Sequence, residues 1–518
     1  MLPEPSVPAW SEMDVEVFDC LVKPDHYVRR ALELMDFERF RPILARYYSP
    51  DQGRPAEDPV RMLKLEFLQY HDTLSDRQVV DRAQTDVAYR GFLGLGLDDE
   101  LPHPTSLCVF RGRIGVEGHR AIFNELVAQA REHGLVRDRL RLKDATHLIA
   151  DVAIPSTLAL IAQVRNKLLG AVEPFDALRA EGERARAEMI RTSTDGRPNE
   201  ERLAARVTHL REILAWVDEL ASPSEGEESR VWQTLVATRG LAHKILADQD
   251  NPKQGDRTIS TVDPDARCGK HGGWYDGYLL DVMMDADSEL ITAVEVLPAN
   301  GDEAADAAEL VRQEEQAQGN DVAALSIDGV GFQGAVLREL QDPEGLDLDV
   351  YVPPKKEPTK GRVAKMFPPT EFVEDPERGV VTCPAGHTSG HHTRSDKHAS
   401  VYRFGRKKCA TCPLLDRCMN KPADHLGRFG RAVRKNDYQA EYDQACEKAN
   451  TPEYQAVRAE HPKIERKLSE LVRRHGIRRA RYRGRWKVAI QALITATVTN
   501  AKRLVHLLDA PATAPDPT

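Results

Sequence analysis

Three carboxylates occupy positions from which they could hold divalent cations. Asp144 lies inside a short run that is rich in Thr, Ile and Val, and Asp328 ends a second apolar run before a Gly-Val-Gly turn. Glu465 lies in a basic segment with helical spacing. Hard cations prefer oxygen ligands, and two of them about 3.5–4 Å apart stabilise the attacking and leaving oxygens of a phosphodiester. The three residues are therefore candidates for phosphodiester chemistry.

Each carboxylate also has an ordinary interpretation. Aspartates at strand ends, such as Asp144, commonly start turns, and Asp151 competes with it from the opposite face of the same strand. A glutamate among arginines is usually a surface ion-pair partner. Glu465, however, borders an apolar face that includes Ile464 and Leu468. This places it near the edge of the core, where a carboxylate could point at a sheet.

Four of the eight cysteines lie in one segment: Cys383, Cys409, Cys412 and Cys418. Thiolates two residues apart close readily on one tetrahedral ion, with Zn–S bonds of about 2.3 Å, so the spacing favours a structural zinc site. The histidines that could replace a cysteine are His387, His391, His392 and His398. An iron–sulfur cluster on the same thiolates, or four buried and unligated cysteines, are the alternatives.

The charge of the chain is divided unevenly. The formal net charge of −10 argues against a nucleic-acid partner, because proteins that bind nucleic acids are normally basic. Residues 401–518, however, hold 25 Lys+Arg against 12 Asp+Glu, which leaves −23 to the first 400 residues. The segment Lys463–Lys487 has 11 basic and 2 acidic residues, with Tyr482 and Trp486 among them. Such a cluster favours phosphate binding, and a solvated helix face is the alternative.

The N-terminal region is predicted to be helical, because Tyr27–Tyr48, Pro59–Tyr70 and Ser75–Ala88 have apolar residues at helical spacing. A further helix presents Arg111 and Arg113 away from its apolar face. Short helices with exposed arginines fit a helix-turn-helix-like DNA-binding domain and an ordinary bundle about equally well. The predicted DNA-binding residues are Arg111, Arg113, Arg473, Arg474, Arg478, Arg479, Arg481, Arg483, Arg485 and Lys487.

Composition excludes several classes of protein. The hydrophobic share of 41% and the charged share of 30% are ordinary, so wholesale disorder is excluded. No run approaches about 18 consecutive apolar residues, so no transmembrane helix is expected. The acidic, Pro-bearing N-terminus lacks the pattern of a signal peptide. We therefore expect a cytoplasmic protein, in a compartment that disfavours disulfides.

The alternation of strands and helices predicts a discontinuous α/β domain with two insertions. Residues 138–154, 257–352 and 455–510 are expected to form its core. The predicted insertions are a helical one at 155–256 and a linker with a small cysteine-rich, metal-binding unit at 353–454. An all-helical DNA-binding domain at 1–137 precedes the core, and a disordered tail at 511–518 follows it.

Several stretches resemble the DDE transposases of bacterial insertion sequences. Residues 58–115 resemble their helical N-terminal domain, and residues 261–307 resemble their hairpin and the following helix. The sequence KDATHL resembles the strand of the first aspartate, with Ala145 where Gly is more usual. SIDGVGF resembles the turn of the second aspartate, with a longer Gly turn than many members have. IERKLSELVRRHGIRRARYRG resembles the helix with the catalytic glutamate.

The resemblance implies an RNase H-like core in which Asp144, Asp328 and Glu465 bind two Mg²⁺ ions. It also implies that water cleaves a phosphodiester at the transposon end and that the freed 3′-hydroxyl then attacks target DNA. The implied partners are double-stranded DNA, as terminal inverted repeats and as target, and a second copy of the chain, at the bacterial nucleoid. Similar cysteines occur in this transposase group, which supports a structural metal.

Two other functions are compatible with the sequence. A nuclease of the same fold would cut DNA without joining it. A catalytically inactive DNA-binding or regulatory protein with a structural metal site would bind DNA without cutting it. All three carboxylates are present, which argues against an inactive copy.

Overall fold

A mixed sheet lies at the centre of the chain, as predicted from the alternation of elements. The computed structural model describes residues 1–2, 10–220, 230–253, 255–355, 366–375, 378–396 and 398–509; the predicted tail at 511–518 lies outside them. The strands are β1 (Arg141–Ile149), β2 (Arg267–His271), β3 (Gly273–Asp285), β4 (Ile291–Pro298), β5 (Ala324–Ser326) and β6 (Asp349–Tyr351).

The strand order is β2–β3–β1–β5–β6, and β4 also pairs with β3. β1 is antiparallel to β3 and parallel to β5, and β6 is parallel to β5. β5 is short and pairs with β1 at Arg141 and Leu142 alone. The next residues of β1, among them Asp144, therefore have no paired strand on that side among the described residues, which leaves room for side chains to converge.

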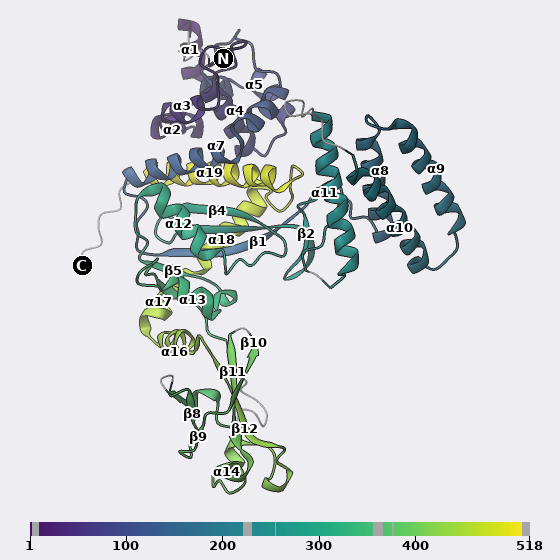
Figure 1. The fold of residues 1–518 in the computed structure, drawn as a ribbon. Coiled ribbons are helices and arrows are strands. Elements are labelled where there is room, and N and C mark those ends of the chain that lie inside the picture. The colour runs from purple at the N-terminus through teal and green to yellow at the C-terminus, as the bar shows by residue number, and fades with distance from the viewer. Residues whose placement is uncertain are drawn as a thin grey trace, which may run out of the picture.

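Helices cover both faces of this sheet (Figure 1). The helices α12 (Ala307–Gln318) and α13 (Gly334–Leu340) pack on one face, in a core that includes Met283. The helices α7 (Thr105–Glu132), α18 (Pro462–His475) and α19 (Arg485–Asp509) pack on the other, in a core that includes Leu142 and Val282. Adjacent residues of a strand face opposite sides of the sheet, so β1 presents side chains to both layers.

The N-terminal helices pack on α7 and α19, which run side by side between them and the sheet (Figure 1). They are α1 (Glu12–Leu21), α2 (Tyr27–Leu34), α3 (Arg41–Ala45), α4 (Pro59–His71), α5 (Asp76–Thr85) and α6 (Val87–Leu93). The predicted helix over 27–48 is broken, because a 3-10 turn at Phe37–Phe40 separates α2 from α3. α7 bends at Gly115, whose φ of +60° favours glycine.

Two excursions leave the sheet and return to it (Figure 1). The first is a helical unit with its own apolar core: α8 (Thr157–Val172), α9 (Ala177–Ser193), α10 (Asn199–Asp218) and α11 (Arg230–Asp250). The second holds two three-stranded sheets, formed by β7 (Val373–Asp375), β8 (Val380–Thr382), β9 (Thr388–Ser389), β10 (His392–Asp396), β11 (Ala399–Gly405) and β12 (Phe429–Asn436).

The chain returns from the second excursion through α16 (Gln439–Lys448) and α17 (Pro452–Glu460) to α18. Within the excursion, the short helix α14 (Arg406–Ala410) contains Cys409, and the short helix α15 (Leu415–Cys418) ends at Cys418. Cys412 lies between these two helices. Among the described helices, none is long and apolar enough to cross a membrane.

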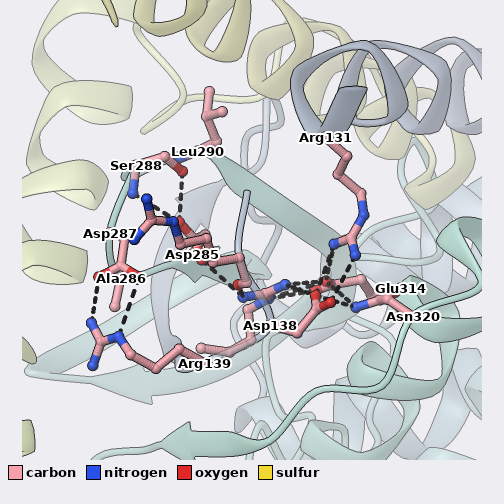
Figure 2. Close-up of polar contacts among 12 residues, drawn as sticks. Arg131, Asp138, Arg139, Asp285, Ala286, Asp287, Ser288, Leu290, Glu314 and Asn320 are labelled. Carbon is pink, nitrogen blue, oxygen red and sulfur yellow. Dashed lines mark hydrogen bonds and ion pairs between the residues drawn. The ribbon is translucent and has the colours of Figure 1, made fainter. Parts of the chain in front are cut away.

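A buried ionic network anchors the first residues of β1. Arg141 is fully buried, and its guanidinium donates to Glu314 of α12 (2.6 Å) and to Asp285 of β3 (2.9 Å). Figure 2 shows the surrounding contacts, in which Arg131 and Asp138 form a further ion pair at 2.9 Å. Moving β1 would leave buried charges unpaired, which is strongly unfavourable. The network therefore fixes the strand that carries Asp144, three residues further on.

Candidate active site

Asp144 lies in β1 with its side chain on the face covered by α18. It is opposite Val282 of β3, which belongs to the core beneath that helix. Asp144 Oδ1 accepts a hydrogen bond from the amide of Ala145 (2.8 Å). Burial raises the pKa of Asp144 to about 6, and the nearby carboxylates of Asp328 and Glu303 add to that rise. Asp144 is thus a half-buried carboxylate among other carboxylates.

Asp328 lies in the turn that follows β5. The predicted strand over 322–328 ends at Ser326, and Asp328 Oδ1 accepts from the amide of Val330 (3.0 Å) to cap a short 3-10 turn. β1 and β5 are parallel neighbours, so Asp328 approaches Asp144 closely enough for their charges to interact. The parallel pairing therefore brings two residues together that are far apart in sequence.

Glu465 lies in the first turn of α18 and is exposed. The same helix buries Ile464, Leu468 and Leu471, and it packs against β1. The predicted apolar face of this helix is therefore confirmed, and Glu465 stands at its edge. The charge of Glu465 favours the protonated form of Arg458 of α17, as do the charges of Asp144 and Asp328.

Arg458 of α17 contacts the end of β5, and the sequence patterns did not single it out. Its Nη1 donates to the carbonyl oxygen of Ile327 (2.9 Å) and to the hydroxyl of Ser326 (3.1 Å). Burial lowers the pKa of Arg458, and the charges of Asp328, Glu465 and Asp144 oppose that fall. Asp151, the competing aspartate, lies beyond the end of β1 and is exposed.

The donor set suits a hard divalent cation. The groups are carboxylate oxygens, which Mg²⁺ prefers, and their mutual repulsion would be relieved by a cation between them. Within the described ranges, no three His, Cys, Asp or Glu side chains lie close enough together to form a closed metal-ligand set. In this structure, therefore, Asp144, Asp328 and Glu465 do not form such a group.

Some cationic side chains of the predicted basic segment are exposed, and others are held by hydrogen bonds to the rest of the chain. Exposed cations occur along the end of α18 and the start of α19: Arg473, Arg474, Arg479, Arg483, Arg485 and Lys487. Two others contact backbone oxygens, because Arg478 donates to His147 (2.6 Å) and Arg481 donates to Leu74 (3.0 Å). Of the exposed set, Arg483 also donates to the backbone oxygen of Asp151 (3.1 Å), and the other five side chains face solvent, where an anionic partner could lie.

The two arginines predicted from the N-terminal region differ in environment. Arg111 is buried, 6% exposed, and pairs with Asp76 and with Glu66 (3.8 Å). It does not face solvent, so the expectation that it contacts DNA does not match its position. Arg113 is exposed and lies over the ring of Tyr48, 4.4 Å from its centroid.

The four clustered cysteines line one small apolar cavity, together with His387. Burial raises the pKa of the Cys418 thiol, and the charges of the three other thiols add to the effect. None of the eight cysteines, all of which the structure describes, forms a disulfide. Within the described residues, however, no closed metal-ligand set is formed here either. The other candidate ligands are exposed histidines: His391, His392 and His398.

Two segments of the chain match known families. Residues 16–113 match a family described as "Transposase domain (DUF772)", and residues 382–505 match one described as "Transposase DDE domain". No curated protein and no solved structure matches the chain. The DDE match includes Glu465 and the four clustered cysteines, whereas Asp144 and Asp328 lie outside both matched segments.

The DDE domain match implies an RNase H-like core. In the sheet described here, β1 is flanked by an antiparallel β3 and a parallel β5, with carboxylates on β1 and after β5. Together the two matches support a DDE-type transposase of an insertion sequence. That family implies a DNA substrate.

Proposed function

We propose that this transposase cleaves DNA at the ends of its element and transfers the freed strand to target DNA. One observation carries the proposal. The charges of carboxylates from β1, from the turn after β5 and from α18 all act on Arg458, in a chain two segments of which match transposase domains. In this function Asp144, Asp328 and Glu465 would hold two Mg²⁺ ions, which would stabilise charge on the attacking and leaving oxygens of the phosphodiester.

The residues of the chain supply position and charge. Arg458 holds the end of β5 through Ser326 and Ile327, and so fixes the turn that carries Asp328. The exposed arginines after Glu465, such as Arg473 and Arg474, bind the phosphates that flank the scissile bond. Holding the strand in line with the attacking oxygen lowers the entropic part of the barrier. Two copies of the chain would pair the two ends of the element.

A joining assay tests this proposal. Purified protein is incubated with Mg²⁺, a labelled duplex that carries the terminal sequence of the element, and a plasmid target. A transposase produces cut ends and labelled target in which the end is covalently joined. Cut ends without joined product would instead assign a nuclease. Binding without either product would assign an inactive DNA-binding protein.

For the cysteines, we propose a structural zinc ion bound by Cys383, Cys409, Cys412 and Cys418. The support is the C-x2-C spacing and the gathering of all four thiols on one cavity. Metal analysis of the purified protein should find about one zinc per chain, the stoichiometry of a four-ligand site. Iron with acid-labile sulfide would assign a cluster instead, and neither metal would leave the cysteines unligated.

A further inference from the structure

We propose that the outer face of α9 packs against α9 of a second copy of the chain, with the two helices parallel. This inference rests on the proposed function, in which two copies pair the ends of the element, and it names the surface through which they meet. The surface belongs to the helical excursion, which lies outside both matched segments.

An apolar stripe runs along the outer face of α9. Leu178 and Met189 are 84% and 65% exposed, and Leu178 is the most exposed of the large apolar side chains that the structure describes. Between them lie Ala185, which is exposed, and Gly182, where an added Cβ would have no other atom within 4 Å. Intervals of four, three and four residues keep these positions on one face of a helix.

The rest of the excursion lies behind this stripe. The residues that α9 buries are Ala180 and Ala187, two positions after Leu178 and two before Met189. At 3.6 residues per turn these positions are about half a turn from the stripe, and they face α8 and α10, which contact α9. α9 lies at the edge of the molecule away from the sheet (Figure 1). A second copy can therefore approach its outer face.

Exposed charges of opposite sign border the two sides of the stripe. Glu181 and Glu188 form an acidic rim along one side, and Arg179 and Arg186 form a basic rim along the other. If the stripe takes the a and d positions of a heptad, the glutamates take g and the arginines take e. Charges at e and g set the orientation and the choice of partner when two helices pack.

These rims favour a second copy in the parallel orientation. When two identical helices pack about a two-fold axis along their length, the g side of each faces the e side of the other. Glu181 then meets the partner's Arg186, five residues further on, and the symmetry makes this contact twice. An antiparallel pair would place each rim against the same rim of the other copy, where like charges repel. The acidic rim also opposes binding of a DNA duplex to this face.

The contact is small, and its ion pairs replace one that exists within the chain. Arg186 lies 2.5 Å from Glu212, and both side chains are about half exposed. Exposed ion pairs contribute little to stability, so exchanging Glu212 for the partner's Glu181 costs little. Burial of Leu178 and Met189 supplies the apolar part of the contact. Three turns of helix bury less area than a typical stable interface, so we expect a weak, reversible dimer.

Sedimentation of the full-length protein at rising concentrations tests this surface. Wild type should dimerise reversibly. Glu181→Arg and Arg186→Glu should each raise the dissociation constant of the dimer at least about tenfold, because each turns two attractive pairs into two repulsive ones. Glu219→Arg makes the same charge change at the exposed end of α10 and should leave the dimer unchanged.

A mixture of the two α9 variants provides the sharpest result. Combined in equal amounts, E181R and R186E should dimerise again as a heterodimer, because positions 181 and 186 then carry opposite charges in both contacts. Loss of folding cannot produce this recovery, and an antiparallel pair would not show it. A mixture that stays monomeric, or a wild type that is monomeric at every concentration, would overturn the assignment.

Two further measurements complete the test. Should a charge variant not fold, Leu178→Ser changes only the exposed stripe, and wild-type dimerisation in that variant would overturn the assignment. The joining assay separates the inference from the proposed function. If E181R and wild type sediment alike and both cut and join DNA, the surface is wrong and the proposed function stands. If the dimers behave as predicted but wild type neither cuts nor joins DNA, the surface stands and the proposed function fails.

Discussion

Arg458 Nη1 lies 2.9 Å from the carbonyl oxygen of Ile327, the residue that immediately precedes Asp328. The same nitrogen lies 3.1 Å from the hydroxyl of Ser326, which is also 3.1 Å from His461 Nδ1. Two side chains from the segment before α18 therefore meet at the end of β5. This contact couples the helix that carries Glu465 to the turn that carries Asp328.

Replacing Arg458 should impair catalysis more than folding. We expect Arg458→Met to reduce strand cleavage about 100-fold, because the Asp328 turn loses its anchor. Arg458→Lys keeps the charge without the planar donor geometry and should recover part of the activity. The control is Arg466→Met on the exposed side of α18, and equal activity in all three variants would contradict this role.

The buried ion pairs of Arg141 at the start of β1 should contribute strongly to the free energy of unfolding. We expect Arg141→Met to lower the free energy of unfolding by about 3–5 kcal/mol, because Glu314 and Asp285 lose their buried partner. Arg312→Met breaks an exposed pair with Glu339 and should cost less than about 1 kcal/mol. Urea unfolding measures both, and similar losses would show that burial of the network is unimportant.

The exposed arginines after Glu465 should set the affinity for DNA. Arg473→Ala and Arg474→Ala should each weaken binding about equally for any sequence, and each should reduce the salt slope by about 1. Arg184→Ala in the helical excursion removes the same charge far from this surface and serves as the control. Binding titrations at several salt concentrations measure the slope, and a slope that neither α18 variant changes would place DNA elsewhere.

His475 should make the junction of α4, α18 and α19 sensitive to acid. Burial lowers the pKa of His475 to about 4; Lys502 and His71 favour the neutral ring, and Glu470 and the Tyr70 backbone oppose them. The unfolded chain binds this proton near pH 6.5, so protonation favours unfolding.

The stability contributed by the neutral His475 ring is complete above about pH 6.5 and is lost as the pH falls towards 4. Between pH 7.5 and pH 5, wild type should lose about 2 kcal/mol more than His475→Gln, as measured by urea unfolding. Parallel losses in the two proteins would mean that other groups determine the acid sensitivity. The comparison is internally controlled, because both proteins share every other titrating group.

Much of the fold follows from local patterns. Helical spacing predicted α4, because it buries a stripe of apolar residues. The chain turns between β3 and β4 after Asp285, which accepts from the amide of Ser288. The six strands of the second excursion are short, between 2 and 8 residues, and too brief for a periodic pattern.

Residue type and local context predicted the elements that carry the three candidate carboxylates. Asp144, Asp328 and Glu465 lie on the elements expected for them. Arg458 could not be found in the same way, because its significance comes from contacts with the end of β5, far away in the sequence. Arg111 shows the converse: its helical position suggested an exposed face, but Glu66 and Asp76 on α4 and α5 enclose it.

The most direct measurement compares wild type with Glu465→Gln on DNA that carries the element's own ends. Glu465 is exposed, so the substitution should leave folding and DNA affinity unchanged. In Mg²⁺, wild type should cut the end and join it to target, and E465Q should give neither product above background. Wild-type levels of cut and joined DNA from E465Q would contradict the assignment of Asp144, Asp328 and Glu465 as the catalytic carboxylates.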